Sequence, residues 1–132
     1  MAYLIDTDTI IYSLKGHEAV TGHLRAHRRF PHFISVITYG ELVYGARKSQ
    51  HPEKNLAVTY RVGELFRIID IDRTIMDAFG ELTASLRTSG TSIQDLDLLI
   101  GATALSRNLT LVTNNLRHFE RIPGLKIENW AA

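Results

Sequence analysis

The stretch Tyr3-Leu4-Ile5-Asp6-Thr7-Asp8-Thr9 decides the fold class of this chain. Three apolar residues end abruptly at Asp6, and a short apolar run bounded in this way is typical of a buried strand. A short helix is predicted to follow, from about Thr9 to Leu14. A buried strand that leads directly into a helix is the first half of an α/β unit.

The rest of the chain repeats this alternation of short apolar runs and helical patterns. Further strands are predicted at residues 33–37, 68–71 and 109–113, with a short fifth strand at 125–127. Helices are predicted at about 18–27, 38–48 and 96–105, after Pro52, and from Ile75 until Gly90. Short buried strands that alternate with helices indicate a mainly parallel sheet with both faces covered. The sequence therefore predicts one α/β domain over residues 1–132, with four or five strands.

Acidic residues interrupt this apolar pattern where a site is expected. Open parallel sheets place their sites at the carboxyl ends of the strands, and Asp6 and Thr113 occupy such ends. Glu41 follows the second predicted strand, and Asp95 and Asp97 open the most apolar helix. Carboxylates that converge repel one another, and a hard divalent cation such as Mg²⁺ or Mn²⁺ removes that penalty. The pattern predicts a metal site able to act on a phosphodiester.

Each of these acids also has a local explanation. Thr38 and Glu41 fit the capping box S/T-x-x-E at the start of a helix. Asp6 or Asp8 could cap the helix that follows the first strand. Asp95 and Asp97 lie in the first turn of the apolar helix, where acids interact favourably with the positive end of the helix dipole. This explains the position of Asp95 better than that of Asp97. The prediction therefore depends on three separated acids meeting at one sheet edge.

Composition limits the function classes. The 132 residues include no cysteine, which excludes disulfides and thiolate metal sites. No apolar stretch is long enough to cross a bilayer, and the N-terminus lacks a signal-peptide pattern, so a cytoplasmic location is expected. The net charge of +1 favours no partner by itself, but positive residues gather in two runs. The candidates to contact the backbone of a nucleic acid, if the chain binds one, are Arg25, Arg28, Arg29, Arg47, Lys48 and, near the predicted cleft, His118.

Four segments resemble the PIN-domain ribonucleases, and the VapC toxins most closely. They are YLIDTDT (3–9), ITYGELVYGA (37–46), IQDLDLLIGATAL (93–105) and LVTNNLRHFERIPGL (111–125), followed by ENW (128–130). They occur in the order of that family and span nearly the whole chain. The resemblance implies a three-layer α/β/α fold and a Mg²⁺- or Mn²⁺-dependent endoribonuclease.

The resemblance also assigns roles to individual residues. Asp6, Glu41 and Asp97 match the three acids of the family and are expected to bind the metal, Glu41 directly or through water. Supporting roles are implied for Asp95, Asp8, Thr113 and Asn115. Asp95 falls where many relatives carry an additional acid, and Asp8 where the family commonly has Asn. Asn115 occupies the position where the family often has a fourth acid, so binding of a second metal ion is expected to be weaker.

Toxin-family membership implies partners as well as a reaction. The substrate is expected to be RNA, hydrolysed at a phosphodiester bond by water activated on the metal. A cognate antitoxin is expected to neutralise the enzyme, and a homodimer is expected, with higher toxin–antitoxin assemblies possible.

Two alternative functions fit part of the sequence. The stretch from Asp6 to Thr9 also matches the D-x-D-x-T opening of the haloacid-dehalogenase-like phosphatases, in which Asp6 would be the nucleophile. That family requires a later lysine in a motif, and none of Lys15, Lys48, Lys54 and Lys126 lies in one. The second alternative is a PIN-fold binding module that has lost catalysis, which the absence of an evident fourth acid allows.

Overall fold

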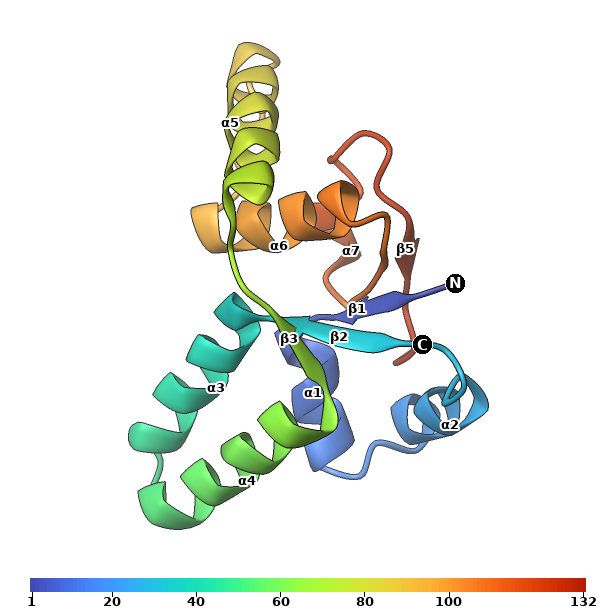
Figure 1. The fold of residues 1–132 in the computed structure, drawn as a ribbon, viewed down its shortest axis with the longest axis vertical. Helices are drawn as coiled ribbons and strands as arrows, with labels where there is room; N and C mark the ends of the chain where they lie inside the picture. Colours follow the sequence, from blue (N-terminus) through green and yellow to red (C-terminus); the bar gives the residue numbers. More distant parts are fainter.

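A five-stranded parallel sheet forms the centre of the computed structural model, which describes residues 1–132 (Figure 1). Its strands are β1 (Tyr3–Ile5), β2 (His32–Ser35), β3 (Arg67–Ile69), β4 (Thr110–Val112) and β5 (Ile127–Glu128). They lie in the order β3-β2-β1-β4-β5, and every neighbouring pair is parallel. The predicted α/β class with a parallel sheet is confirmed, and the sheet has five strands.

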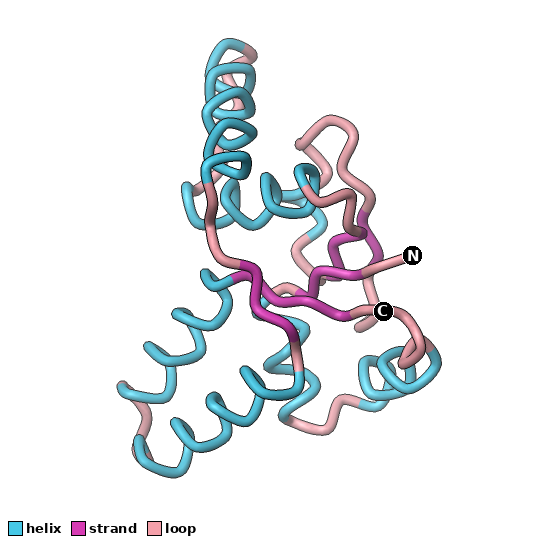
Figure 2. The backbone as a smooth tube through the Cα atoms, viewed as in Figure 1, coloured by secondary structure: helices cyan, strands magenta, loops and turns pink.

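Seven helices cover the two faces of this sheet (Figures 1 and 2). They are α1 (Thr7–Leu14), α2 (Glu18–Ala26), α3 (Val36–Arg47), α4 (Pro52–Leu65), α5 (Arg73–Thr88), α6 (Asp95–Ser106) and α7 (Leu116–Phe119). One core cluster joins residues of α5, α6 and α7 to one face of the sheet, and a second joins residues of α1 to α4 to the other. The predicted three-layer α/β/α arrangement is therefore present.

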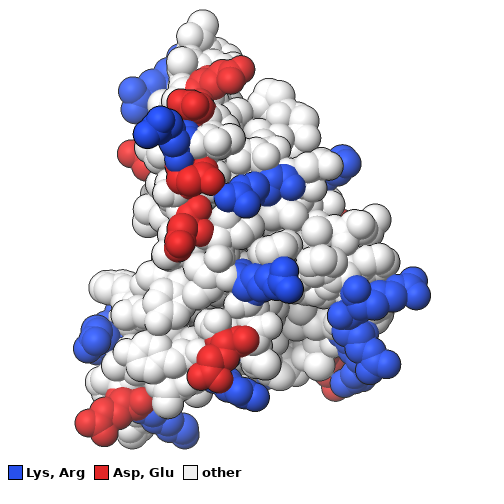
Figure 3. Space-filling view, viewed as in Figure 1, with Lys and Arg blue, Asp and Glu red and all other residues white.

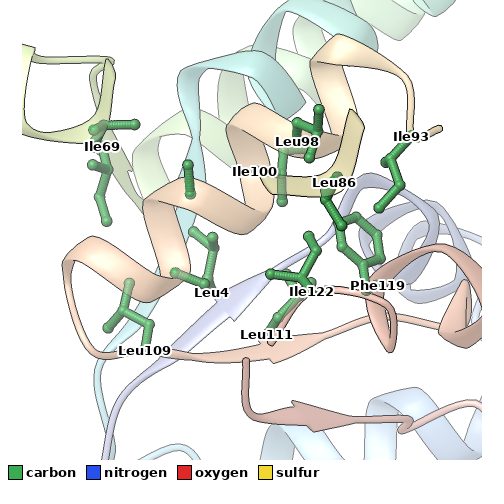
Figure 4. Packing of buried hydrophobic residues seen from close by; sticks show 13 residues of the cluster. Leu4, Ile69, Leu86, Ile93, Leu98, Ile100, Leu109, Leu111, Phe119 and Ile122 are labelled. Carbon is green, nitrogen blue, oxygen red and sulfur yellow. The ribbon is translucent and has the colours of Figure 1, made fainter. Parts of the chain in front are cut away.

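Successive side chains along each strand point alternately into these two clusters. Leu4 faces the α5–α7 side, whereas its neighbours Tyr3 and Ile5 face the α1–α4 side. In β4, Leu111 and Val112 divide in the same way. Figure 4 shows the first cluster, with Leu4 and Leu111 beneath side chains from α5, α6 and α7. Side chains that alternate between two buried faces explain why these strands read as continuous apolar runs.

The strand order places a topological switch point between β1 and β4. The chain moves from β1 outward to β2 and β3, and then returns to the other side of β1 with β4 and β5. In open α/β sheets, ligands bind in the crevice outside the carboxyl ends of the strands at such a point. Asp6 and Thr113, which directly follow β1 and β4, therefore lie at this crevice.

The second strand and the helix after it differ from the prediction. The predicted strand at 33–37 ends at Ser35, and α3 begins at Val36 rather than at Thr38. Ser35 is the N-cap, because its hydroxyl accepts a hydrogen bond of 3.0 Å from the backbone N–H of Ile37. The predicted capping box of Thr38 and Glu41 is therefore wrong. The β-branched residues 36 and 37 favour a strand locally, but the serine cap and the packing of α3 place them in a helix.

Other element bounds shift by a few residues. The third strand covers 67–69 instead of 68–71, because Asp72 is needed as the N-cap of α5, where it accepts from the N–H of Ile75 at 2.9 Å. The fourth strand is shorter than predicted by two residues, and the fifth begins at Ile127, two residues later than predicted. The one-turn helix α7 was not predicted.

The middle of α6 packs closely against the segment after α7. A Cβ atom at Gly101 would lie 2.6 Å from Cδ1 of Ile122, so a larger residue there would require the Ile122 side chain to move. Separately, none of the seven helices combines the length and the apolar character needed to cross a membrane.

Candidate active site

Asp6 is the central acid of the site and one of its most buried polar residues. Only 6% of its surface is exposed. Oδ1 accepts a hydrogen bond of 2.8 Å from the N–H of Thr7, and Oδ2 accepts one of 2.7 Å from the hydroxyl of Thr113. The hydroxyl oxygen of Thr113 in turn accepts from the N–H of Asn115 at 3.0 Å. Asp6 therefore caps α1 and also binds β4 across the switch point.

Burial makes Asp6 difficult to ionise. Desolvation raises the pKa of its carboxyl from 3.8 to about 7, and the nearby charges of Asp8 and, to a smaller extent, Asp97 add to that rise. The hydrogen bonds from Thr113 and Thr7 favour the charged form but do not cancel the rise. A nearby cation would reverse this balance, because it would lower the free energy of the carboxylate.

Asp8 faces the same crevice from the first turn of α1. Its Oδ2 accepts a hydrogen bond of 3.1 Å from the N–H of Asn114 and lies 3.5 Å from the hydroxyl of Thr113. The side-chain amide of Asn114 donates to the hydroxyl of Tyr12 at 3.3 Å. Asp8 thus holds the loop after β4 in place.

Glu41 reaches the site through Thr7, which the sequence analysis did not single out. The hydroxyl of Thr7 donates to Oε1 of Glu41 at 2.7 Å and lies 3.0 Å from the hydroxyl of the buried Thr38. Thr7 also donates its N–H to Asp6, so one residue contacts two of the three predicted metal ligands. Its position between Asp6 and Asp8 in a D-T-D-T stretch was the available sequence signal.

Asp97 pairs with a histidine at the other wall of the crevice. Nδ1 of His118 lies 3.1 Å from Oδ2 of Asp97 and 3.1 Å from Nδ2 of Asn115. A single ring nitrogen cannot donate to Asp97 and accept from Asn115 at once, so the proton on Nδ1 selects between these partners. The structure places His118 within the acid site, although the sequence suggested it only as a contact for the RNA backbone.

Asp95 is separate from this group of acids. It is exposed, makes no hydrogen bond through its side chain, and lines a small cavity between α5 and α6 together with Arg87 and Leu98. The first helical position explains Asp95 by the helix dipole alone. Asp97, two residues later, faces the crevice.

The predicted metal ligands share one edge of the sheet but do not yet converge on one point. No three acidic or histidine side chains lie close enough together to hold a metal ion as they stand. Glu41 is held by Thr7 and Asp97 by His118, and carboxylates without a cation between them repel one another. The donors themselves are the carboxylate oxygens that Mg²⁺ and Mn²⁺ prefer.

An apolar cleft opens beside Glu41. Its volume is about 480 Å³, and its walls come from α3 and the start of α6, including the exposed side chains of Tyr44 and Leu96. The Nζ atom of Lys48 lies 4.9 Å from the centre of the Tyr44 ring. Arg47 and Lys48 therefore lie at the far end of α3, on the flank of this cleft.

The first basic run lies elsewhere. Arg28 and Arg29 precede β2, and Arg25 lies in the last turn of α2, so all three belong to the amino edge of the sheet. The acids lie at the carboxyl edge. The four residues of β2 rise by about 3.3 Å each, which separates the two edges by roughly 13 Å. These three arginines, which the sequence suggested as contacts for the RNA backbone, therefore do not lie beside the acids.

A doubly wound parallel sheet with buried and half-buried acids at its switch point defines a class of α/β proteins whose site suits a cation and an anionic substrate. The sequence model described as "PIN domain" matches residues 3–125. The chain belongs to the PIN-domain family, and its relatives there are VapC proteins.

Those relatives match it from end to end. The protein named "tRNA(fMet)-specific endonuclease VapC" of Salmonella typhimurium (strain LT2) is 40% identical, with 98% of each chain covered. The protein of the same name from Shigella flexneri is 35% identical over 99% of each chain. "Ribonuclease VapC2" of Haemophilus influenzae (strain Rd) is 37% identical over 98% of each.

Solved structures agree with this assignment. The structure of VapBC2 from Rickettsia felis bound to a promoter DNA fragment contains a chain with a TM-score of 0.92 and 35% identity, covering 98% of this chain and 99% of that one. DNA-bound VapBC from Salmonella typhimurium gives a TM-score of 0.92 and 39% identity, with 98% of both chains covered. These likenesses do not favour the phosphatase alternative.

Proposed function

We propose that this chain is a Mg²⁺- or Mn²⁺-dependent endoribonuclease that acts as the toxin of a toxin–antitoxin pair in the cytoplasm. The observation that carries the proposal is that Asp6, Glu41 and Asp97, from three separate parts of the chain, lie along the carboxyl edge of the sheet, where Thr7 links Asp6 to Glu41 and the charge of Asp97 acts on Asp6. The names of the full-length relatives, which are endonucleases and ribonucleases, support the same reaction.

Asp6 and Asp97 would hold the metal ion, with Glu41 joining them directly or through a water molecule. The raised pKa of Asp6 supports this assignment, because burial and the charges of Asp8 and Asp97 disfavour its carboxylate and a divalent cation would offset that cost. Bound there, the ion would supply positive charge to the scissile phosphate and would help water to lose a proton at neutral pH.

The other residues of the site would position these groups. Thr113 would orient the carboxylate of Asp6 from β4, and Thr7 would hold Glu41 at the correct distance from it. In the hydrolysis, the water oxygen forms a bond to phosphorus as the bond to the leaving ribose oxygen breaks. The proton lost from water goes to a neighbouring base or to solvent, and the leaving oxygen receives a proton in turn.

The substrate to test first is initiator tRNA. Two of the three relatives described above are named for tRNA(fMet), and both match this chain over nearly its full length. Total cellular RNA is the appropriate starting material, because it contains tRNA, rRNA and mRNA together. Sequencing of the new ends would then show which of them is cut.

The proposed partners are a cognate antitoxin and a second copy of the chain. The similar solved structures are VapBC complexes from three bacteria, which supports a protein partner of the VapB kind. Co-purification with the product of a neighbouring small gene would test the antitoxin. Light scattering on the purified chain would test the dimer.

The first experiment compares cleavage of total RNA by the wild-type protein and by Asp97→Asn, with Mg²⁺, Mn²⁺ or EDTA. Asp95→Asn is the matched control, because it makes the same change two residues away, outside the acid site. We expect discrete cleavage by the wild type and by Asp95→Asn only with metal, and a loss of roughly a thousandfold in Asp97→Asn, since a catalytic ion is worth several kcal/mol.

Metal binding needs a readout that does not depend on cleavage. Calorimetric titration with Mn²⁺ should give a clear binding isotherm for the wild type and for Asp95→Asn, and a much weaker one for Asp97→Asn. Equal cleavage by Asp97→Asn would contradict the proposed site. Metal binding without cleavage of any RNA would favour the inactive binding module instead.

A further inference from the structure

A positively charged site lies at the amino edge of the sheet, away from the acidic site at the carboxyl edge. A cavity of about 390 Å³ opens there between the loop that leads into β2 and the start of β3. Three arginines line it, Arg28 and Arg29 from the loop and Arg67 from the first position of β3. Arg67 lies 38 residues after Arg29 in the sequence, so only the parallel pairing of β2 with β3 brings the three charges together.

The three arginines are free to bind an anion. None of them forms an ion pair, since the ion pairs of the structure involve Arg61, Arg107 and His118 instead. Two acids lie three residues from Arg67 along the chain: Glu64 is already paired with Arg61 at 3.0 Å, and Asp70 follows the opposite end of β3 and forms no ion pair with Arg67. Between Glu18 and Glu41 the sequence contains no acid at all.

Charge gathers visibly on this side of the molecule. Figure 3 shows Lys and Arg side chains grouped over α2 and the approach to β2, on the right of the view, with few acidic atoms beside them. Arginine suits phosphate groups in particular, because its planar fork of N–H donors matches their oxygens. A group of unpaired arginines therefore indicates a phosphate-bearing ligand.

The loop that carries two of the arginines is held rigidly. The N–H of Phe30 donates to the carbonyl of His27 at 2.9 Å, and the carbonyl of Pro31 accepts from the N–H of Tyr3 at 3.0 Å. Nδ1 of His32 lies 2.7 Å from the carbonyl oxygen of Phe30. Behind the loop, the ring of Trp130 stacks on His27 at 4.8 Å between centroids and meets Tyr3 edge-on at 5.0 Å. A site fixed in advance loses less entropy when it binds.

The walls of the cavity also suit a nucleic acid. The guanidinium carbon of Arg29 lies 5.1 Å from the centre of the Phe30 ring, and Leu65 adds an exposed apolar surface. Cations next to an aromatic ring and an apolar ledge are typical of surfaces that track a single-stranded backbone. The cavity is open, and the length of β2, roughly 13 Å, separates the amino edge from the carboxyl edge, so one RNA molecule could contact both edges.

We infer that the cavity lined by Arg28, Arg29 and Arg67 binds the phosphodiester backbone of the RNA substrate at a distance from the bond that is cut. The inference rests on the proposed ribonuclease function, since that function brings RNA to this protein. The site adds affinity and holds a folded RNA in one orientation, but it reads no sequence, because phosphate contacts carry no base information. Substrate selection thereby depends on RNA shape as well as on the bases near the acids.

The test measures binding of fluorescently labelled bulk tRNA in EDTA, where no cleavage occurs, across a range of salt concentrations. The variant is Arg28→Gln/Arg67→Gln, and the matched control is Lys54→Gln/Arg87→Gln, which removes the same charge from α4 and α5. The variant should bind roughly tenfold more weakly near 0.1 M salt, as expected for two surface ion pairs. Its salt slope should fall by about 1.4, or about 0.7 for each lost contact. The control should resemble the wild type.

A conservative pair separates charge from loss of structure. Arg28→Lys/Arg67→Lys keeps both charges, so the salt slope should return to that of the wild type, while circular dichroism checks that every variant is folded. An equal loss of binding in the control pair would overturn the inference, because bulk charge would then explain the effect.

Three further outcomes would also overturn the inference, and they differ in what they say of the ribonuclease. Unchanged tRNA binding by the variant, with Asp97-dependent cleavage intact in Mn²⁺, would remove this site but keep the enzyme. A wild type that neither binds nor cleaves RNA would remove both. If the variant instead loses binding only to a poly-glutamate peptide, the cavity belongs to an acidic protein segment.

Discussion

The two edges of the central sheet hold their functional residues by different means. At the carboxyl edge, burial and, to a smaller extent, the charges of Asp8 and Asp97 raise the pKa of Asp6 to about 7, so its ionised form is costly without a cation nearby. At the amino edge, Trp130, Tyr3 and neighbouring imidazoles pack tightly behind a loop that presents arginines. At the carboxyl edge, the ionised Asp6 lowers the stability of the fold, whereas at the amino edge close packing raises it. Substitutions at the two edges should therefore change stability in opposite directions.

The largest effect on stability is expected at the amino edge. Trp130 is 1% exposed, packs against Tyr3 and His27, and donates its indole N–H to Glu128 at 2.9 Å. Trp130→Ala should lower the free energy of unfolding by about 4 kcal/mol, because it leaves a large cavity. Urea denaturation would measure the change, with the half-exposed Tyr60→Ala as control. A loss no greater than that of the control would mean that packing does not hold this edge.

At the carboxyl edge, a substitution is expected to raise the free energy of unfolding rather than lower it. In metal-free protein, Asp6→Asn should raise the free energy of unfolding by about 3 kcal/mol at pH 8, because it removes a carboxylate that burial disfavours and keeps a side chain that can cap α1. The folded-state pKa lies above the unfolded value of 3.8. The wild type therefore loses stability as the pH rises toward about 7, and the gain in the variant should nearly vanish at pH 4.

Urea denaturation at both pH values in EDTA measures this difference, and Asp95→Asn should show no such pH dependence. Addition of Mn²⁺ should stabilise the wild type more than Asp6→Asn. A variant less stable than the wild type at pH 8 without metal would contradict the view that the acids strain the fold.

A smaller effect is expected from the residue that connects two of the acids. Thr7→Val keeps the shape of the side chain but frees Glu41 from its hydrogen bond of 2.7 Å. Cleavage should fall by roughly tenfold to a hundredfold, as it does when a partner that orients a metal ligand is lost. Thr83→Val is the control, because the hydroxyl of Thr83 binds only a backbone carbonyl within α5. Full activity in Thr7→Val would show that Glu41 needs no such support.

The smallest effect on stability is expected for the imidazole of His32 at the amino edge. Burial lowers the pKa of His32, with the charge of His27 adding to the shift and the hydrogen bond to Phe30 opposing it. The folded state therefore favours the neutral ring, and its contribution to stability is lost as the pH falls below the unfolded value of 6.5 through the folded one. His32→Asn keeps a donor for the Phe30 carbonyl and should lose less stability between pH 7 and pH 5 than the wild type. Equal losses in thermal unfolding would argue against a buried neutral His32.

Much of the fold was readable because its signals are local. Each strand was marked by a short apolar run, and each predicted strand exists within a few residues of its place. The mistake at Thr38 and Glu41 has a physical cause. Two residues that can cap a helix, Ser35 and Thr38, lie one turn apart, and the sequence does not reveal which of them ends the strand.

The site was readable only in part. Acids at the ends of strands stood out because charged residues rarely follow buried apolar runs, and the family resemblance then selected Asp6, Glu41 and Asp97. Nothing local showed that Thr7 would bind Glu41 or that His118 would bind Asp97, because these partners are 34 and 21 residues apart. The helix dipole explained Asp95 better than Asp97 in the sequence, but only the rotation of α6 shows that Asp95 lies on the α5 side and Asp97 at the crevice.

The sequence by itself determined the parallel α/β class and the placement of acids at one sheet edge, since both follow from the spacing of apolar residues along short segments. Tertiary structure decided which side chain each acid contacts and where the basic runs lie. Thr113 reaches Asp6 across 107 residues only because β4 pairs with β1. Arg28 and Arg67 meet on the opposite edge because β2 and β3 run parallel, which brings the starts of both strands together. Such contacts depend on strand order, which no local pattern contains.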